Sequence, residues 1–320
     1  MLHPRAFKVT VVWTLTLLFL GSIVHATESS LACPDWPTCF GTMVPEMTGG
    51  IFWEHLHRLV AGGLVLMFVL ATWLARRETS DRPWVFRACL AGIGLLLVQS
   101  VFGGLTVLYQ LPDLVSTTHL TLAFSFLTLA TVLAAMSDGA QTRQVGDPAG
   151  SAPSAIEGFG PGVGARLRAF AASSAALVFV QSVLGALVRH TDGGMSCPDV
   201  PLCLGQVVPP LVNIQITSHF LHRLFAIIAT VAVISLTGWA LRVEMPPRVR
   251  RWVLAASALV VVQVALGVWS VLSILDVPPV SLHTLVAASL LVALTAAASF
   301  GARAGTPSGA GRSERHESPV

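Results

Sequence analysis

Residues 53–58 read WEHLHR and place a carboxylate, two imidazoles and a guanidinium within an otherwise apolar stretch. A related run, SHFLHR at residues 218–223, begins 165 positions later at the head of another apolar stretch. Ionisable side chains inside a membrane segment are costly and usually serve a function. The recurrence of such a run indicates that the chain consists of two similar halves with related sites.

The composition is that of a membrane protein. Of the 320 residues 54% are apolar and 11% are charged, and the mean hydropathy is +0.74. Because soluble domains have about 25% charged residues, we predict an all-α polytopic membrane protein. Eight apolar stretches are long enough to cross about 30 Å of hydrocarbon. They lie near 8–26, 52–74, 87–108, 116–136, 167–188, 217–241, 252–273 and 282–301.

The distribution of basic residues predicts the orientation. Sixteen of the nineteen Lys and Arg residues fall in the termini and in the alternate loops that share one side; the others are Arg58, Arg189 and Arg223. Short loops rich in Lys and Arg stay in the cytoplasm, so we expect both termini to be cytoplasmic. Because the basic residues are spread over predicted cytoplasmic loops beside anionic lipid, the net charge of +3 gives no reason to expect nucleic acid binding.

The repeat predicts the architecture. His119 and His283 are 164 positions apart, as are QSVFG at 99–103 and QVALG at 263–267. Four spans per half leave both halves in the same orientation, so we expect two pseudo-symmetric four-helix bundles. The predicted parts are an N-terminal half at 1–136, a cytoplasmic linker at 137–165, a C-terminal half at 166–301 and a disordered cytoplasmic tail at 302–320.

Four of the five cysteines form two close pairs in outward-facing loops, Cys33 with Cys39 and Cys197 with Cys203. On the oxidising side of a membrane, the default interpretation of such pairs is a structural disulfide. Thiol exchange with an external redox partner is the alternative. Zinc is disfavoured, because neither pair has two further ligands nearby.

Four histidines stand out among ten, since each even-numbered span carries one of them at similar depth. They are His57, His119, His222 and His283. A flat macrocycle that holds an iron needs one imidazole on each face, and facing helices of a bundle supply such a pair. We therefore expect His57 with His119 in one half and His222 with His283 in the other. The neighbouring His25, His55 and His190 are interpreted as structural.

The residues around these histidines differ between the halves. Glu54 lies three positions before His57, on the same helix face, whereas His219 takes that place before His222. A buried carboxylate can position a proton, so we assign chemistry to the first half and a stable bis-histidine haem to the second. Arg58 and Arg223 are placed either to neutralise porphyrin propionates or to reach the lipid headgroups.

Taken together, these motifs resemble the bacterial type of the haem A synthase family over nearly all of residues 8–301. The matching motifs are CPDWPTC at 33–39, EHLHR at 54–58, His119, the pair Cys197 and Cys203, His222 with Arg223, and His283. The resemblance implies oxidation of the C8 methyl of haem O to a formyl by successive hydroxylations, which gives haem A for terminal oxidases. One departure is His25, where the family usually has an arginine; Arg189 keeps it in the second half.

The resemblance also implies cofactors and partners. His222 and His283 would hold a haem b, and the substrate haem O would lie near His57 and His119 with Glu54 essential. The implied partners are a haem O synthase, an electron donor such as a ferredoxin with its reductase, and terminal oxidase assembly factors. The chain would lie in the bacterial cytoplasmic membrane. Whether it forms a homo-oligomer is left open by the resemblance.

Two other functions fit the residues. A di-haem electron carrier of cytochrome b type would use both histidine pairs without chemistry of its own, although it has no need of Glu54 in one half only. A thiol-disulfide relay would use the four outer cysteines, and its histidines would hold a structural haem.

Overall fold

The computed structural model describes residues 3–76, 83–137 and 158–304. Within these ranges it contains eight helices that are long and apolar enough to cross a membrane, which confirms the predicted all-α membrane architecture. They are α1 (His3–Ala26), α2 (Gly49–Ala75), α3 (Pro83–Leu108), α4 (Asp113–Ser137), α5 (Val163–His190), α6 (Ile214–Ala240), α7 (Pro247–Leu272) and α8 (Val277–Ala304). A single 3₁₀ turn, η3 (Gly193–Met195), follows α5.

Most helices extend beyond the apolar stretches that predicted them. Helices of 24 to 28 residues are about 36–42 Å long at about 1.5 Å per residue, whereas the hydrocarbon core is about 30 Å thick. Their ends therefore reach polar surroundings, where local signals start the helix. Asn213 accepts a hydrogen bond from the Ile216 N–H (2.8 Å) at the start of α6, and Pro247 occupies the first turn of α7.

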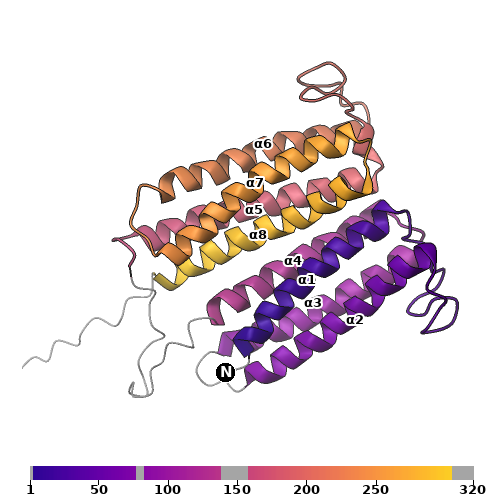
Figure 1. Cartoon of the computed structure of the whole chain (residues 1–320), viewed down its shortest axis with the longest axis horizontal. Helices are drawn as coiled ribbons and strands as arrows, with labels where there is room; N and C mark the ends of the chain where they lie inside the picture. The colour runs from indigo at the N-terminus through magenta and orange to yellow at the C-terminus, as the bar shows by residue number, and fades with distance from the viewer. Residues whose placement is uncertain (1–2, 77–82, 138–157, 305–320) are drawn as a thin grey trace, which may run out of the picture.

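The helices form two groups of four, as predicted (Figure 1). α1 to α4 pack together, α5 to α8 pack together, and the two groups lie side by side. Contact between them is made by α1 and α4 of the first half with α5 and α8 of the second. At this boundary the Ser22 hydroxyl of α1 donates to the Thr284 hydroxyl of α8 at 3.1 Å.

Central and peripheral helices differ in burial. The most apolar window of α8 has 61% of its residues buried within the protein, whereas that of α6 has 17%. Large apolar side chains such as Leu66 of α2 and Ile227 and Val231 of α6 point outward. In a lipid environment such exposure carries no cost, because lipid tails are as apolar as these side chains.

The predicted linker and tail lie largely outside the described residues, which omit 138–157 and 305–320. At the near ends of these segments, Ser137 belongs to α4, Val163 begins α5 and α8 continues to Ala304. Before α5, Phe159 packs against the hydrophobic core and the Gly160 N–H donates to the Glu244 carbonyl at 3.3 Å. The C-terminal part of the predicted linker is thus attached to the second half.

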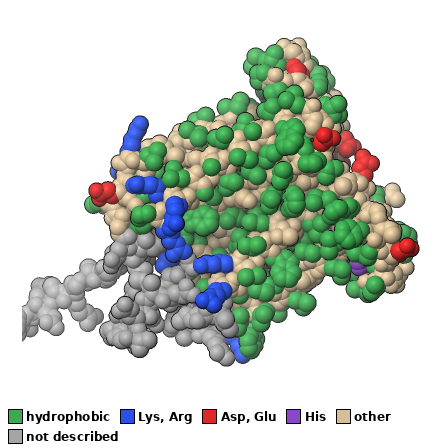
Figure 2. All heavy atoms as spheres, in the orientation of Figure 1, with side chains coloured by type: hydrophobic (Ala, Val, Ile, Leu, Met, Phe, Trp, Pro, Cys, Tyr) green, Lys and Arg blue, Asp and Glu red, His purple; other side chains and the backbone are tan. Residues whose placement is uncertain are grey.

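Charged side chains separate between the two ends of the molecule (Figure 2). Blue Lys and Arg atoms gather at the end where α1 begins and α8 ends, and most of the red Asp and Glu atoms lie at the end that carries the disulfide loops. This is the pattern on which the predicted orientation rests. The orientation itself stays a prediction.

Candidate functional site

The loop between α1 and α2 and the loop between α5 and α6 each contain a small ring closed by a disulfide, between Cys33 and Cys39 in the first half and between Cys197 and Cys203 in the second. These are the predicted pairs. The fifth cysteine, Cys89, is free and buried. Both rings lie at the same end of the molecule, in the loops that precede α2 and α6, and His57 and His222 lie near the starts of these two helices.

A carboxylate organises each ring from within. Asp35 accepts hydrogen bonds from the Thr38 hydroxyl and from the N–H groups of Phe40 (2.6 Å) and Gly41 (2.9 Å). The Thr38 hydroxyl, followed by the Gly41 N–H, lowers the pKa of Asp35. The second ring repeats the two backbone contacts, because Asp199 accepts from the N–H groups of Leu204 and Gly205 at 2.8 and 2.7 Å.

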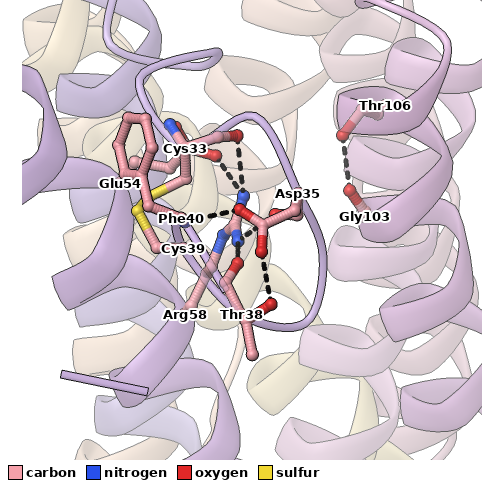
Figure 3. A network of polar contacts seen from close by, with 9 residues as sticks. All are labelled: Cys33, Asp35, Thr38, Cys39, Phe40, Glu54, Arg58, Gly103 and Thr106. Carbon is pink, nitrogen blue, oxygen red and sulfur yellow. Dashed lines mark hydrogen bonds and ion pairs between the residues drawn. A yellow bond between two sulfur atoms is a disulfide. The ribbon is translucent and has the colours of Figure 1, made fainter. Parts of the chain in front are cut away.

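Arg58 of α2 holds the first ring from below (Figure 3). Its guanidinium donates to the carbonyl oxygens of Asp35 (2.7 Å), Thr38 (2.5 Å) and Cys33 (3.4 Å). A planar guanidinium with five N–H donors suits a ring of converging carbonyls. The described partners of this guanidinium are loop carbonyls and Glu54, and its predicted contact with a propionate stays a prediction.

Arg223 does the same in the second half. Its guanidinium donates to carbonyls of the second ring, namely those of Asp199 (2.7 Å), Leu202 (2.6 Å) and Cys197 (2.5 Å). Propionate binding by Arg223 therefore also stays a prediction. The arginine that follows His57 and the one that follows His222 thus each anchor a disulfide ring.

Glu54 is buried and joins the first ring to α2. One carboxylate oxygen accepts a hydrogen bond from the Cys33 N–H at 2.7 Å, and the other pairs with Arg58 at 2.5 Å. Its counterpart His219 has Nδ1 2.9 Å from the Gly193 carbonyl. Both side chains thus contact the loop above them, but only Glu54 brings a carboxylate to this position.

Each of the four candidate haem ligands packs its ring against a glycine of the preceding helix. A Cβ on that glycine would lie 2.8–3.1 Å from the ring Cε1, closer than side-chain atoms normally approach. The pairs are Gly21 with His57, Gly103 with His119, Gly185 with His222, and Gly267 with His283. The glycines recur at intervals of 82 residues, so each half itself repeats one helix pair. The sequence analysis missed this period, although the spacing was visible.

Side-chain amides support the histidines of the second half. The Gln181 Nε2 lies 3.0 Å from Nδ1 of His222 and donates to the His222 carbonyl at 2.8 Å. The Gln263 Nε2 lies 3.1 Å from Nε2 of His283. Such amides orient the rings, as neighbours of metal-bound histidines commonly do.

The first half supports its histidines differently. Nδ1 of His119 lies 3.0 Å from the backbone carbonyl of Gln99 rather than from a side-chain amide. The position one repeat before Gln99 is Leu17, and Nδ1 of His57 is buried without a hydrogen-bond partner among the described residues. The ligand candidates of the first half are therefore held less tightly by polar contacts.

A cavity of about 430 Å³ lies beside the first pair of histidines. Its volume falls in the range of about 300–1,000 Å³ that small-molecule sites occupy. His57, His119 and Glu54 all line it, so the structure brings together the three residues predicted to carry chemistry. The second half contributes to the wall with Arg189, His190 and Thr284.

Trp36 covers this cavity from the first ring. Its indole packs on α3, where a Cβ on Gly104 would lie 2.8 Å from the indole Cδ2, and both Trp36 and Pro37 line the cavity. The equivalent positions in the second half are Val200 and Val268. An aromatic cover on a glycine is thus a feature of the first half. The sequence indicated that the loop with Trp36 covers the bundle, but not that the indole packs on Gly104.

Two histidines interpreted as structural lie on the same wall. The ring centroids of His25 and His190 are 5.3 Å apart across the boundary between the halves. Nδ1 of His190 is 3.1 Å from the Thr117 hydroxyl, and Nδ1 of His25 is 3.4 Å from the Ser30 hydroxyl. Their position on the cavity depends on how the halves pack and could not be seen in the sequence.

A third group of possible metal ligands lies beneath the first ring. The ligand atoms of Cys33, Cys39 and His55 lie within 4.8 Å of one another. Both sulfur atoms belong to the disulfide and are not thiolates, and Nε2 of His55 is 3.1 Å from the Met43 carbonyl. These contacts agree with the structural role expected for His55.

The two histidine pairs are suited to act as axial ligands of a haem iron. His222 and His283 come from different helices, and their ring centroids are 6.3 Å apart. Nδ1 of His57 and Nδ1 of His283 are buried without partners among the described residues, so each half offers an unused imidazole nitrogen. Imidazole is a usual axial ligand of haem iron. The glycines next to the imidazole rings leave the space beside each ring free of side chains.

The comparisons with known proteins point to one family. Residues 46–295 match the family model described as cytochrome oxidase assembly protein. A haem A synthase of Symbiobacterium thermophilum is 32% identical over 281 residues, which cover 86% of this chain and 87% of the relative. The haem A synthases of Halalkalibacterium halodurans and Shewanella oneidensis are 27% and 25% identical, and the matches cover 87% and 90% of this chain and 90% and 93% of the relatives.

Proposed function

This chain belongs to the cytochrome oxidase assembly family, and the relatives reported above are haem A synthases. From that premise we propose that it is a haem A synthase. It is an oxidoreductase that converts haem O to haem A. The reaction oxidises the C8 methyl of the ring to a formyl by two successive monooxygenase-type hydroxylations, each of which consumes one dioxygen, two electrons and two protons and releases one water, followed by loss of water from the doubly hydroxylated carbon. The product serves terminal oxidases.

The observation that supports this proposal best is the asymmetry between two otherwise similar halves. The first half has a carboxylate, two histidines and an aromatic cover around a cavity, namely Glu54, His57, His119 and Trp36. The second half has a histidine at the position of Glu54 and side-chain amides on both ligand candidates. A symmetric electron carrier has no use for this difference, whereas an enzyme with one reacting and one resident haem does.

In the first half, we assign His57 and His119 to the iron of the substrate haem and Glu54 to the proton chemistry at its edge. Glu54 is buried on the cavity wall, and its carboxylate is held by the Cys33 N–H and by Arg58. A carboxylate in that position can hold a proton or accept one while the methyl is oxidised. Water is kept out by Trp36 and by the ring that Arg58 anchors.

In the second half, His222 and His283 are proposed to hold a haem b, which supplies an electron store when bound. Gln181 and Gln263 orient the two rings, and Gly185 and Gly267 leave room for them. Arg58 and Arg223 are still proposed to contact propionates, through guanidinium N–H groups that do not donate to the loop carbonyls. The halves at 1–136 and 166–301 would thus have separate roles, substrate conversion and electron supply.

The partners and the location belong to the same proposal. A haem O synthase would supply the substrate, an electron donor such as a ferredoxin with its reductase would supply electrons, and oxidase assembly factors would receive the product. The chain would lie in the bacterial cytoplasmic membrane with both termini in the cytoplasm, because Lys and Arg gather at that end. A homo-oligomer is compatible with the apolar peripheral helices.

The first test is a product analysis. The chain is expressed in a bacterium together with a haem O synthase and purified in detergent, and the extracted haems are separated by chromatography with mass detection. We expect haem A or its hydroxylated precursor. Haem b alone, from folded protein with haem O supplied, would favour the di-haem electron carrier instead.

A second measurement addresses the thiol-disulfide relay. The double variant Cys33→Ser with Cys39→Ser is assayed for haem A in the same system, with bound haem b as the check on folding. We expect product formation to persist at a reduced level, because the ring only positions Glu54 and Trp36. Complete loss of product with haem b retained, even under reducing conditions, would favour the relay.

A further inference from the structure

Arg189 is a half-buried cation with no counter-charge among the described residues. It lies near the C-terminal end of α5, in the second half, yet it lines the cavity of the first half. Its Nε is buried and has no hydrogen-bond partner among the described residues. Arg58 and Arg223, by contrast, each donate to at least three loop carbonyls.

The surroundings of Arg189 supply neutral groups rather than an anion. His25 and His190 lie beside it with ring centroids 5.3 Å apart, and their partners are the hydroxyls of Ser30 and Thr117. Within the described ranges no carboxylate lies at ion-pair distance from Arg189; the nearby Glu54 is paired with Arg58. A charge taken out of water is tolerated when an opposite charge and hydrogen bonds compensate it.

We propose that Arg189 binds a carboxylate of the tetrapyrrole substrate, one of the two propionates of haem O, across the boundary between the halves. His25 and His190 flank this subsite and offer ring nitrogens to the same carboxylate. Guanidinium binds carboxylates through two parallel N–H donors, which fixes the orientation of the ligand as well as its affinity. The inference rests on the proposed function, since it names the group on the substrate that this wall of the cavity recognises.

The proposal changes how the two halves are related. The position equivalent to Arg189 in the first half is His25, 164 residues earlier. Arg189 of the second half therefore provides the cation that the first half lacks at its own equivalent position. The substrate site is then formed by both halves, and it depends on the packing of α1 and α4 against α5 and α8.

The test compares haem O with its dimethyl ester, in which both carboxylates are neutral. Binding to the purified protein, with haem b in place, is followed by difference absorbance titration for the wild type and for Arg189→Gln and Arg189→Lys. Arg242→Gln is the matched control, because Arg242 is an exposed arginine just beyond the C-terminal end of α6, far from the end that carries His222. Bound haem b per chain shows whether each variant is folded.

The wild type is expected to bind haem O roughly ten- to a hundredfold more tightly than the ester, as a charge-assisted hydrogen bond to a carboxylate would give. Arg189→Gln should bind the acid and the ester nearly equally, Arg189→Lys should recover part of the difference, and Arg242→Gln should match the wild type. Equal binding of acid and ester by the wild type would overturn the inference and would indicate that Arg189 contacts a lipid headgroup or only the protein.

The outcome separates this inference from the proposed function. A wild-type chain that makes haem A but does not distinguish the ester would retain the function and lose the carboxylate subsite. A chain that prefers the acid through Arg189 yet makes no haem A would retain the subsite and lose the enzyme. If Arg189→Gln loses haem b through misfolding, the comparison of the two ligands on the wild type and on Arg189→Lys decides.

Discussion

Gly185 lies so close to the ring of His222 that a Cβ on the glycine would be 2.8 Å from the imidazole Cε1. The same contact recurs in every helix pair of the chain, although the residues around it differ. Because a methyl group cannot be placed there unless the ring moves, the glycine sets the position of the histidine. The position next to the histidine therefore needs a glycine for steric reasons.

Gly185→Ala is expected to displace His222 and to weaken haem b binding. Overpacking of this kind costs about 1–3 kcal/mol, which corresponds to roughly a five- to 150-fold loss of affinity. Haem b per purified chain, measured by the pyridine haemochrome spectrum, checks this. Gly238→Ala, in the helix that carries His222, has no atom within 4 Å of the added methyl and should bind haem normally. Equal haem content in the two variants would contradict the steric role.

Glu54→Gln is expected to lower haem A formation by about 100-fold or more, the size of a typical general acid-base contribution. The amide can still accept a hydrogen bond from the Cys33 N–H, but it can neither hold a negative charge nor exchange a proton. Product formation per bound haem b is the measurement, and the exposed loop residue Glu46, changed to Gln, is the control. Wild-type product levels in Glu54→Gln would show that the chemistry lies elsewhere.

Trp36→Ala should open the cavity of the first half. The indole packs on Gly104 and forms part of the cavity wall, so its removal takes away contact with the substrate and admits water. We expect the KM for haem O to rise several-fold to tenfold, as loss of a large aromatic contact predicts, with haem b content unchanged. Val200→Ala, at the same place in the second ring, should leave the KM as it is. A similar change in both variants would argue against a cover specific to the first half.

The first ring should loosen in acid. Because the Thr38 hydroxyl and backbone N–H groups lower the pKa of Asp35 below its usual 3.8, the ionised carboxylate stabilises the ring above that pH. This stabilisation is lost as the pH falls through the lowered pKa. Amide hydrogen exchange at Phe40 and Gly41 should therefore show stable protection from neutral pH down to about 4, after correction for the intrinsic rate.

Asp35→Asn should show the loosened state already at neutral pH, and Thr38→Val should move the loss of protection to higher pH, because Thr38 makes the largest contribution. The second ring is an internal control: there, Asp199 accepts from Leu204 and Gly205 without an equivalent hydroxyl bond. Protection in Asp35→Asn equal to that of the wild type at neutral pH would show that the disulfide alone holds the ring.

The sequence was sufficient for the architecture because burial in lipid imposes simple rules. A helix must satisfy its own backbone hydrogen bonds and must be long enough to cross the hydrocarbon, so apolar stretches reveal their number and approximate bounds. The helices run several residues further, from Val163 rather than 167 in α5 for example, because polar ends lie outside the apolar stretch. The repeat of 164 residues also predicted that the helices form two groups.

For the site, the sequence identified the ionisable residues that are expensive inside a membrane, Glu54 and the four haem-ligand candidates, because their chemical type alone makes them exceptional. It did not show what they contact. The guanidinium of Arg58 was expected at a propionate or a headgroup. Among the described residues it donates to loop carbonyls, because the ring closed by Cys33 and Cys39 folds back over the helix end, and the propionate contact stays a prediction.

Sequence by itself thus determined that this is an eight-span, two-half membrane protein of the haem A synthase family, because hydropathy, repeat spacing and motif are local properties of the chain. Only the tertiary structure decided that Trp36 lies on Gly104, that Arg189 of one half lines the cavity of the other, and that His25 meets His190. These relationships join residues up to 165 positions apart. The first depends on how the loop before α2 folds onto α3, and the other two depend on how the two bundles pack against each other, which no local pattern encodes.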